Sequence, residues 1–132
     1  MGGIDRLSLS YSYYLTLAHV NLNCITNKIV HVSNLLYTNK IDILCVSETW
    51  LNPVILDSVL SIKNYDIVRM DSPSGVRKHG VAIYIKCGLP FDIFDVNAPN
   101  VIVISLSNYN IFVVYIYIDH PKVALIKTKK AC

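Results

Sequence analysis

The stretch VIVISLSNYNIFVVYIYI, residues 101–118, limits the possible folds more than any other feature of the sequence. It is close to the length of a transmembrane helix, which needs about 20 apolar residues. However, its middle, SLSNYN, carries two serines and two asparagines, and β-branched residues dominate both halves. Two such halves around polar turn residues are typical of a β-hairpin. The sequence therefore predicts two strands that turn at Asn108–Asn110, in preference to a membrane span.

A β-α-β unit is predicted nearer the N-terminus. Residues 14–23, YLTLAHVNLN, alternate between apolar and polar side chains, as a half-buried strand does. A helix through about residue 39, capped by Thr26 or Asn27, is indicated by apolar residues at spacings of three and four: Ile29, Val32, Leu35 and Leu36. The short apolar run IDILCVS, residues 41–47, then indicates a buried strand. This order predicts two neighbouring strands in one sheet.

Most of the remaining chain has strand patterns. Strands are expected at residues 65–70, 81–87 and 91–96, with a short helix or turn at 54–61 and a polar loop at 71–80. One helix-bearing unit followed by antiparallel-looking strands predicts a layered α/β sandwich with a mainly antiparallel sheet and one flanking helix. The expected domain spans residues 14–121. An N-terminal extension, residues 1–13, precedes it, and a basic tail, residues 122–132, follows it and loses the strand pattern.

The composition agrees with one small, ordered domain. A chain of 132 residues is long enough for one core but not for two. Hydrophobic residues make up 53% and charged residues 16%, compared with about 45–50% and about 25% in typical domains. This composition excludes a disordered chain. The net charge of +3 permits contact with a polyanion but does not argue for one.

The cysteines give no sign of a metal site. Cys24, Cys45, Cys87 and Cys132 are scattered, without a Cys-x-x-Cys pair. The N-terminus lacks the compact apolar segment and the cleavage site of a signal peptide. A reduced, intracellular protein is therefore expected.

Three polar positions fall at or near predicted strand ends. Asn21 or Asn23 ends the first strand, Glu48 follows the second, and Tyr115 lies in the last. Ligands of α/β sheets gather outside strand ends, on loops that a rigid scaffold carries. Taken one by one, such residues are more often structural, so the spacing alone is weak support for a site.

Several segments resemble the endonuclease domain of non-LTR (LINE-type) retrotransposons, both in their residues and in their order along the chain. These segments are LAHVNLNCITNKIVHVSNLL, IDILCVSETWL, NYDIVRMDS, HGVAIYIK and IFVVYIYIDHP. The resemblance runs from about residue 17 to residue 121, and SETWL is part of its most specific segment. Such domains belong to the endonuclease/exonuclease/phosphatase superfamily, together with apurinic/apyrimidinic endonucleases and DNase I. The resemblance implies part of a DNase I-like four-layer α/β sandwich and metal-dependent nicking of DNA.

The resemblance also implies roles for individual residues. Glu48 matches the metal-binding glutamate of the family, whose cation is usually Mg²⁺, with Mn²⁺ as the alternative. A hard cation of this kind takes one or two carboxylates plus water and substrate phosphate. Asn21 matches the active-site asparagine that orients the metal or the phosphate. Tyr115 matches the tyrosine that hydrogen-bonds the scissile phosphate.

The chain departs from the family pattern in several places. Only Gly80 precedes VAIY, where the family has two or three glycines, and Ile116–Ile118 stand where it has Arg-Pro-Pro. The family's later Asp-x-Asn and Ser-Asp-His should lie well beyond residue 132. Asp119–His120 spells Asp-His, but it directly follows the tyrosine strand and is rejected as the catalytic pair. We therefore expect the N-terminal half of such a domain, truncated and inactive as this chain.

Two other functions stay open at this point. A non-catalytic fragment would act only by association, through the sheet face that half a sandwich exposes. Another phosphoesterase of the same superfamily, such as an inositol phosphatase, would share the site but not the substrate.

The expected partner is DNA, with no membrane contact and with possible self-association through the exposed sheet face. The basic residues Arg69, Arg77 and Lys78 are candidates for contact with DNA phosphates, although a solvated loop explains them equally well. A functional endonuclease of this type would act in the nucleus.

Overall fold

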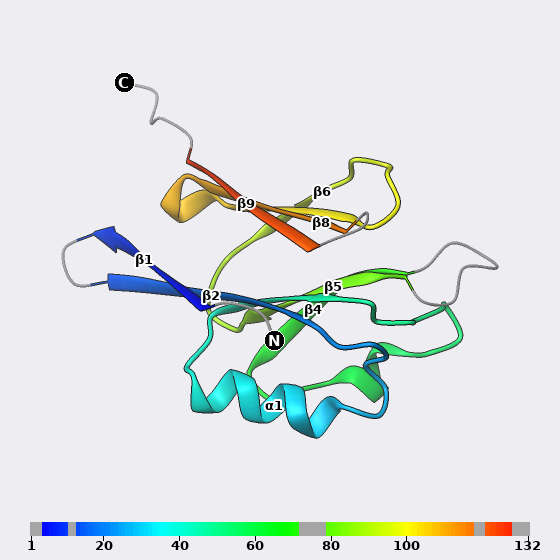
Figure 1. Cartoon of the computed structure of the whole chain (residues 1–132). Helices are drawn as coiled ribbons and strands as arrows, with labels where there is room; N and C mark the ends of the chain where they lie inside the picture. Colours follow the sequence, from blue (N-terminus) through cyan, green and yellow to red (C-terminus); the bar gives the residue numbers. More distant parts are fainter. Residues whose placement is uncertain (1–3, 11–12, 72–78, 118–120, 128–132) are drawn as a thin grey trace.

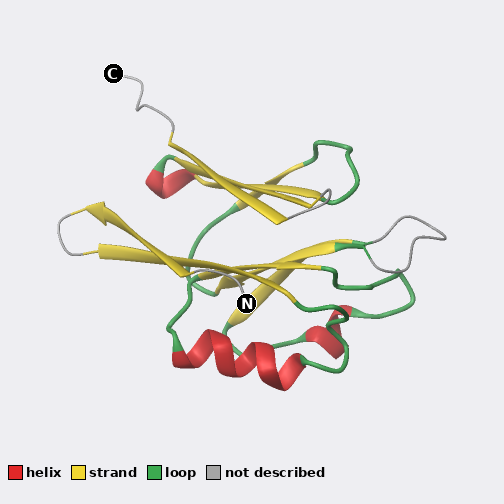
Figure 2. Cartoon of the chain, in the orientation of Figure 1, coloured by secondary structure: helices red, strands yellow, loops and turns green. Residues whose placement is uncertain are grey.

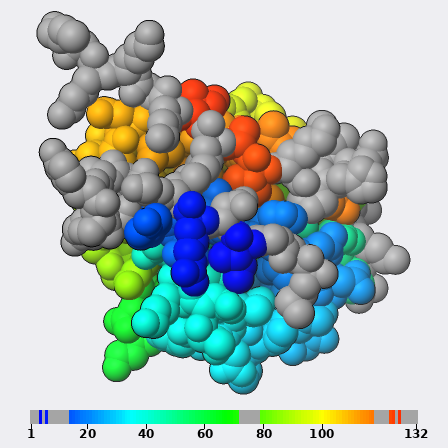
Figure 3. All heavy atoms as spheres, turned by 60° about the vertical axis from the view of Figure 1, so that its left-hand side comes forward, coloured from blue at the N-terminus to red at the C-terminus, as the bar shows by residue number. Residues whose placement is uncertain are grey.

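The computed structural model describes residues 4–10, 13–71, 79–117 and 121–127, which form three layers. A five-stranded sheet lies between a single α-helix and a four-stranded sheet (Figure 1, Figure 2). Seen from another side, the helix (cyan), β1 of the first sheet (dark blue) and β9 of the second sheet (red) follow one another across the surface (Figure 3). This arrangement confirms the predicted α/β sandwich with one flanking helix.

The five-stranded sheet contains the predicted β-α-β unit. Its strands, in spatial order, are β1 (Ile4–Ser10), β2 (Tyr13–Asn21), β3 (Ile43–Ser47), β5 (Val81–Lys86) and β4 (Tyr65–Met70). Only β2 and β3 pair in parallel, and α1 (Ile29–Thr38) connects them. The other neighbours pair antiparallel. A short 3₁₀ helix, η1 (Asp57–Leu60), lies between β3 and β4.

The four-stranded sheet contains the predicted hairpin. Its strands are β6 (Asp92–Phe94), β7 (Val101–Leu106), β8 (Ile111–Tyr117) and β9 (Pro121–Lys127), all antiparallel. The turn is a 3₁₀ helix, η2 (Ser107–Tyr109), followed by Asn110 with a φ of 54°, a left-handed conformation that asparagine tolerates. In the described ranges, no helix is long and apolar enough to cross a membrane.

Two apolar cores hold the layers together. Between the sheets, Ile83 of β5 packs with Ile104 and Val113 of the hairpin, each fully buried. Between the first sheet and α1, Leu44 and Tyr84 pack with the helix residues Val32 and Leu36. Strands β3 and β5 are covered on both faces, which explains why they are nearly continuous apolar runs.

The helix starts later than predicted. It begins at Ile29, Lys28 is its N-cap, and no side chain caps it. The hydroxyl of Thr26 lies 3.3 Å from the sulfur of Cys24 instead, and Lys28 donates to the carbonyls of Asn23 and Cys24. The predicted cap at Thr26 or Asn27 was therefore wrong, because the N-cap position is occupied by Lys28.

Two outer strands were also missed. β1 lies within the predicted N-terminal extension, and β9 occupies residues that were expected to lose the strand pattern. Both pair with one neighbour only, at the end of a sheet. Backbone hydrogen bonds can hold such an edge strand even when its side chains show no strand pattern. Pro121 is the first residue of β9, a position that proline tolerates in an edge strand.

The helix-side core gives a stability prediction. Leu36 is fully buried, so Leu36→Ala is expected to lower the free energy of unfolding by about 2–4 kcal/mol through lost burial and a residual cavity. Val30 lies on the same helix but is 75% exposed, so Val30→Ala should change it by less than about 0.5 kcal/mol. Urea unfolding followed by circular dichroism measures both. Equal losses would mean that α1 does not pack on the sheet through Leu36.

Candidate functional site

Asn21 and Glu48 meet where β2 and β3 end. The two strands are parallel, and Asn21, the last residue of β2, pairs in register with Ser47, the last residue of β3. Glu48 follows at once, and the Nδ2 amide of Asn21 donates a hydrogen bond to Glu48 Oε2. Asn21 is exposed and Glu48 is partly exposed, so solvent reaches both. The fold therefore brings together two of the three residues that the sequence singled out.

Backbone hydrogen bonds fix the segment Ser47–Trp50 from both sides. On the β2 side, the N–H groups of residues 22, 24 and 25 donate to the carbonyls of residues 47, 48 and 49 at 3.1, 2.9 and 3.1 Å. On the β5 side, the N–H groups of Thr49 and Trp50 donate to the carbonyls of Gly80 and His79 at 3.2 and 3.0 Å. Glu48 is thus carried by a backbone that has little freedom to move.

This segment is also strained. Glu48 has a φ of 52° and Trp50 a φ of 58°, both in the left-handed region. Residues other than glycine and asparagine rarely adopt this backbone conformation, and each residue that does so costs about 1–3 kcal/mol of stability. Strained residues persist where the surroundings over-determine them, and they cluster at binding and active sites. The backbone at Glu48 therefore supports a functional site at this strand end.

Asn100 connects this segment to the second sheet. Its side-chain Oδ1 accepts a hydrogen bond of 2.9 Å from the N–H of Gly80, whose carbonyl in turn accepts from Thr49. Gly80 has a φ of 102°, which favours glycine. The carbonyl of Asn100 accepts from the N–H of Tyr117 at 3.0 Å. Asn100 could not be singled out beforehand, because an asparagine before a strand is an ordinary turn residue.

Three buried polar atoms lie between the sheets at the same end. They are Tyr115 Oη, Ser47 Oγ and His19 Nδ1, and none of the three has a partner at full hydrogen-bond geometry among the described residues, although the Tyr115 and Ser47 side chains lie near each other. His19 pairs in register with Cys45, two residues before Ser47. Burial raises the pKa of Tyr115 well above its usual range, and the nearby Ser47 hydroxyl opposes this while Cys45 and Tyr117 add to it.

The burial of Tyr115 bears on its predicted role. The side chain is completely buried, although its hydroxyl lies close enough to Ser47 to affect its pKa. This hydroxyl is shielded from solvent in the structure. Contact between Tyr115 and a phosphate stays a prediction.

Arg69 uses all five of its N–H groups inside the protein. They donate to Asp71 (twice), Asp57 and the carbonyls of Asn52 and Ile55, at distances of 2.7–3.0 Å. These bonds raise its pKa, with Asp71 as the largest cause. The contacts give Arg69 a structural role in holding the loop between β3 and η1, and its contact with DNA stays a prediction. Arg77, Lys78 and the rejected pair Asp119–His120 lie outside the described residues.

The donor set fits a hard cation. Within the described residues, no group of three or more His, Cys, Asp or Glu side chains could hold a metal ion. One carboxylate beside an amide is enough for Mg²⁺ or Mn²⁺, which keep several waters and bind through one or two carboxylates plus a phosphate. Cys45 is completely buried and burial strongly raises its pKa, so it offers no thiolate to a softer metal.

Two tyrosines provide a matched test of the orphan hydroxyl. Tyr84 donates to the carbonyl of Leu60 at 2.7 Å, whereas Tyr115 has no described partner. Tyr84→Phe should lower the free energy of unfolding by about 1 kcal/mol, and Tyr115→Phe should leave it unchanged or raise it by up to about 1 kcal/mol. Chemical denaturation gives both values. An equal loss in both variants would show that Tyr115 has a partner in solution.

Comparisons with known proteins agree with the fold. No family model and no curated protein matches the chain. Among solved structures, the AP endonuclease LMAP from Leishmania major matches 85% of this chain and 39% of its own, with a TM-score of 0.54 and 15% identity. An AP endonuclease from Archaeoglobus fulgidus matches 77% and 37%, with a TM-score of 0.48 and 23% identity.

The likeness to LMAP concerns the fold alone, because the identity is low. The chain spans less than two-fifths of the length of either enzyme. The sequence predicted an α/β sandwich with a mainly antiparallel sheet and one flanking helix, and the structure adds a second sheet that covers the other face of the first. The chain therefore has the DNase I-like α/β sandwich fold that the LMAP structure also shows.

Proposed function

We propose that this chain carries the cation-binding strand end of a DNA endonuclease similar to those of LINE-type retrotransposons, and that it would act in the nucleus. One observation carries the proposal. A partly exposed carboxylate, Glu48, is held beside Asn21 on a strained backbone segment that is fixed from both sides. The DNase I-like fold and the resemblance of the SETWL segment to that family support it further.

Each residue of the site would contribute in a different way. Glu48 would bind Mg²⁺ or Mn²⁺, and Asn21 would orient the carboxylate or the phosphate through its amide. A bound divalent cation supplies positive charge that offsets the charge of a phosphodiester and its leaving oxygen. The fixed backbone keeps Glu48 in place, so little conformational entropy is lost when the cation binds.

We further propose that the chain binds the cation but does not cleave DNA. Phosphoryl transfer depends on several positioned groups that act together. In the part of the chain that the structure describes, Glu48 belongs to no group of three or more His, Cys, Asp or Glu side chains that could hold a metal ion. The site as proposed consists of Glu48 and Asn21, and no residue is assigned to activate the attacking water.

Cation binding is tested by thermal unfolding at increasing Mg²⁺ and Mn²⁺. A ligand at 100 times its Kd stabilises the folded state by about 2.7 kcal/mol, so the melting temperature should rise with cation concentration. Glu48→Asn should abolish this rise. It should also raise the stability of the cation-free protein by up to about 1 kcal/mol, because asparagine tolerates the left-handed backbone. Asp92, an exposed aspartate on β6, is the control.

The control variant Asp92→Asn removes an exposed carboxylate in the other sheet and should keep the rise in melting temperature. A rise that survives in Glu48→Asn would reject Glu48 as the cation ligand.

Cleavage is tested by nicking of supercoiled plasmid with Mg²⁺, with EDTA and Glu48→Ala as controls. We expect no nicking by a folded sample. Nicking that both controls abolish would contradict the proposed inactivity. It would still support the proposal that the chain is related to DNA endonucleases.

A second candidate is a non-catalytic role through self-association. Phe94 and Ile126, at the two edges of the second sheet, are 50% and 51% exposed, and the rings of Phe94 and Phe112 are in contact with centroids 5.2 Å apart. No described element covers the outer side of this sheet (Figure 1). Light scattering on the purified chain tests the proposal. A dimer that Phe94→Lys converts to a monomer would support it, and a monomer at all concentrations would reject it.

A further inference from the structure

Tyr115 and Tyr117 lie next to each other on one face of β8. Successive side chains of a strand point to opposite faces, and residues 111, 113 and 115 are buried whereas residues 112 and 114 are only partly buried. Tyr117 therefore faces the first sheet, as Tyr115 does. It packs against the buried cluster between the sheets that contains Tyr115 and Val81. The Tyr117 ring thus lies between Tyr115 and the end of β8.

His79 brings a second ring to this place from the first sheet. It lies two residues before Val81, the first residue of β5, and its carbonyl accepts a hydrogen bond of 3.0 Å from the N–H of Trp50. The rings of His79 and Tyr117 are in edge-to-face contact, with centroids 6.0 Å apart and planes at 76°. This is a favourable arrangement of aromatic rings. Both residues are partly exposed, so the pair lies at the surface and connects the two sheets.

Backbone hydrogen bonds hold both members of this ring pair. The N–H of Tyr117 donates to the carbonyl of Asn100 at 3.0 Å, and the Oδ1 atom of Asn100 accepts from the N–H of Gly80 at 2.9 Å. Because Gly80 directly follows His79, Asn100 fixes the backbones of the two rings relative to each other. The ring contact is therefore set by the same network that anchors the segment carrying Glu48.

The hydroxyl of Tyr115 is closed off from solvent beside the ring pair. It has no partner at full hydrogen-bond geometry among the described residues, so contact with water would stabilise it. Burial is the main cause that raises its pKa, and Tyr117 adds to this through its charge interaction, which places the two side chains close together. Such a hydroxyl stays dry only where neighbouring side chains exclude water.

We propose that the rings of His79 and Tyr117 form a cover that keeps solvent and ligands away from the Tyr115 hydroxyl. The two residues act through Tyr115, so they are positioning residues. The cover itself does not depend on Glu48. Its consequence for binding rests on the proposed function: the cover decides whether a phosphate held by a cation at Glu48 contacts Tyr115.

Chemical labelling of tyrosine hydroxyls tests the cover. N-acetylimidazole acetylates the hydroxyls that it reaches, and mass spectrometry of peptides measures each tyrosine separately. The starting variant is Tyr117→Phe, which keeps the ring but cannot itself be acetylated. Tyr115 should stay unlabelled in it, whereas Tyr14, which is 61% exposed, should be labelled. Tyr117→Ala should speed the labelling of Tyr115 at least ~tenfold, because access no longer requires a local opening of the structure.

Two changes at His79 test the second ring. Both are made together with Tyr117→Phe. His79→Ala should speed the labelling of Tyr115, whereas His79→Phe should keep Tyr115 protected, because a phenyl ring can make the same edge-to-face contact. A role of the imidazole nitrogens in place of the ring would give equal labelling in both variants and would contradict the cover.

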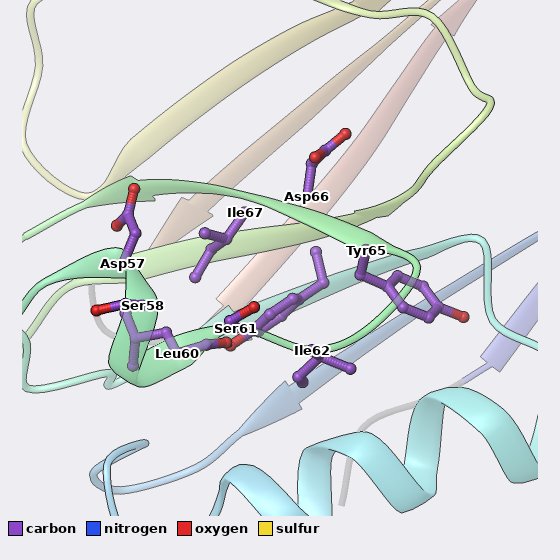
Figure 4. A pocket seen from close by; sticks show the side chains of 9 residues that line it. Asp57, Ser58, Leu60, Ser61, Ile62, Tyr65, Asp66 and Ile67 are labelled. Carbon is purple, nitrogen blue, oxygen red and sulfur yellow. The ribbon is translucent and has the colours of Figure 1, made fainter.

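Tyr84 shows whether a variant has only loosened its fold. It is the matched buried tyrosine on the other side of the first sheet, is 1% exposed and donates to the carbonyl of Leu60. It lines a cavity of about 310 Å³ beside η1, whose walls include Leu60, Ile62 and Ile67 (Figure 4). A reagent that enters a loosened fold would therefore reach Tyr84 as well. In every variant named above, Tyr84 should stay protected.

The connection to Glu48 is tested with Mg²⁺ and a short single-stranded oligonucleotide. Added together to Tyr117→Ala, they should slow the labelling of Tyr115, and a further Glu48→Asn change should remove this protection. If labelling increases as expected but the oligonucleotide gives no protection, the cover is supported and the proposed function at Glu48 is contradicted.

Three outcomes would overturn the cover. One is equal labelling of Tyr115 in Tyr117→Phe and Tyr117→Ala. Another is a Tyr115 that stays protected when His79 is changed to alanine. The third is labelling of Tyr84 and Tyr115 at equal rates, which would mean that general loosening of the fold governs access.

Discussion

The structure depends most on the double backbone anchoring of the segment Ser47–Trp50. Bonds from residues 22–25 on one side and to residues 79–80 on the other continue the sheet past the formal end of β3. They join three loops that are far apart in the sequence, and Asn100 connects the same network to the second sheet. Without them, a strained residue such as Glu48 would relax to an ordinary backbone conformation. Fold stability and site geometry are therefore maintained by the same bonds.

The sequence predicted those parts of the fold that burial dictates. The hairpin of β7 and β8, the β-α-β unit and β4 all carry side-chain patterns that match their exposure. The resemblance to a known family added the positions of Asn21 and Glu48, which the structure brings into contact. These predictions were confirmed because the order of apolar and polar residues indicates which side chains of an element are buried.

The rest of the fold and of the site depends on hydrogen bonds that produce no periodic pattern in the sequence. β1 and β9 are held by backbone pairing at sheet edges, and the helix lacks the side-chain cap that its sequence offered. The left-handed backbone of Glu48 and the bond from Gly80 to Asn100 arise only when segments distant in sequence meet. The complete bonding of Arg69 likewise depends on a loop whose shape the sequence did not give. A local pattern holds no information on such contacts.

The bonding of Arg69 also limits which residues this position can accept. Its planar guanidinium offers five N–H donors, and two carboxylates and two backbone carbonyls accept them. Lysine carries the same charge but has only three donors on one nitrogen, so it would leave some of these acceptors without a partner. Among relatives that keep the loop between β3 and η1, arginine should therefore be retained here while other surface cations exchange freely.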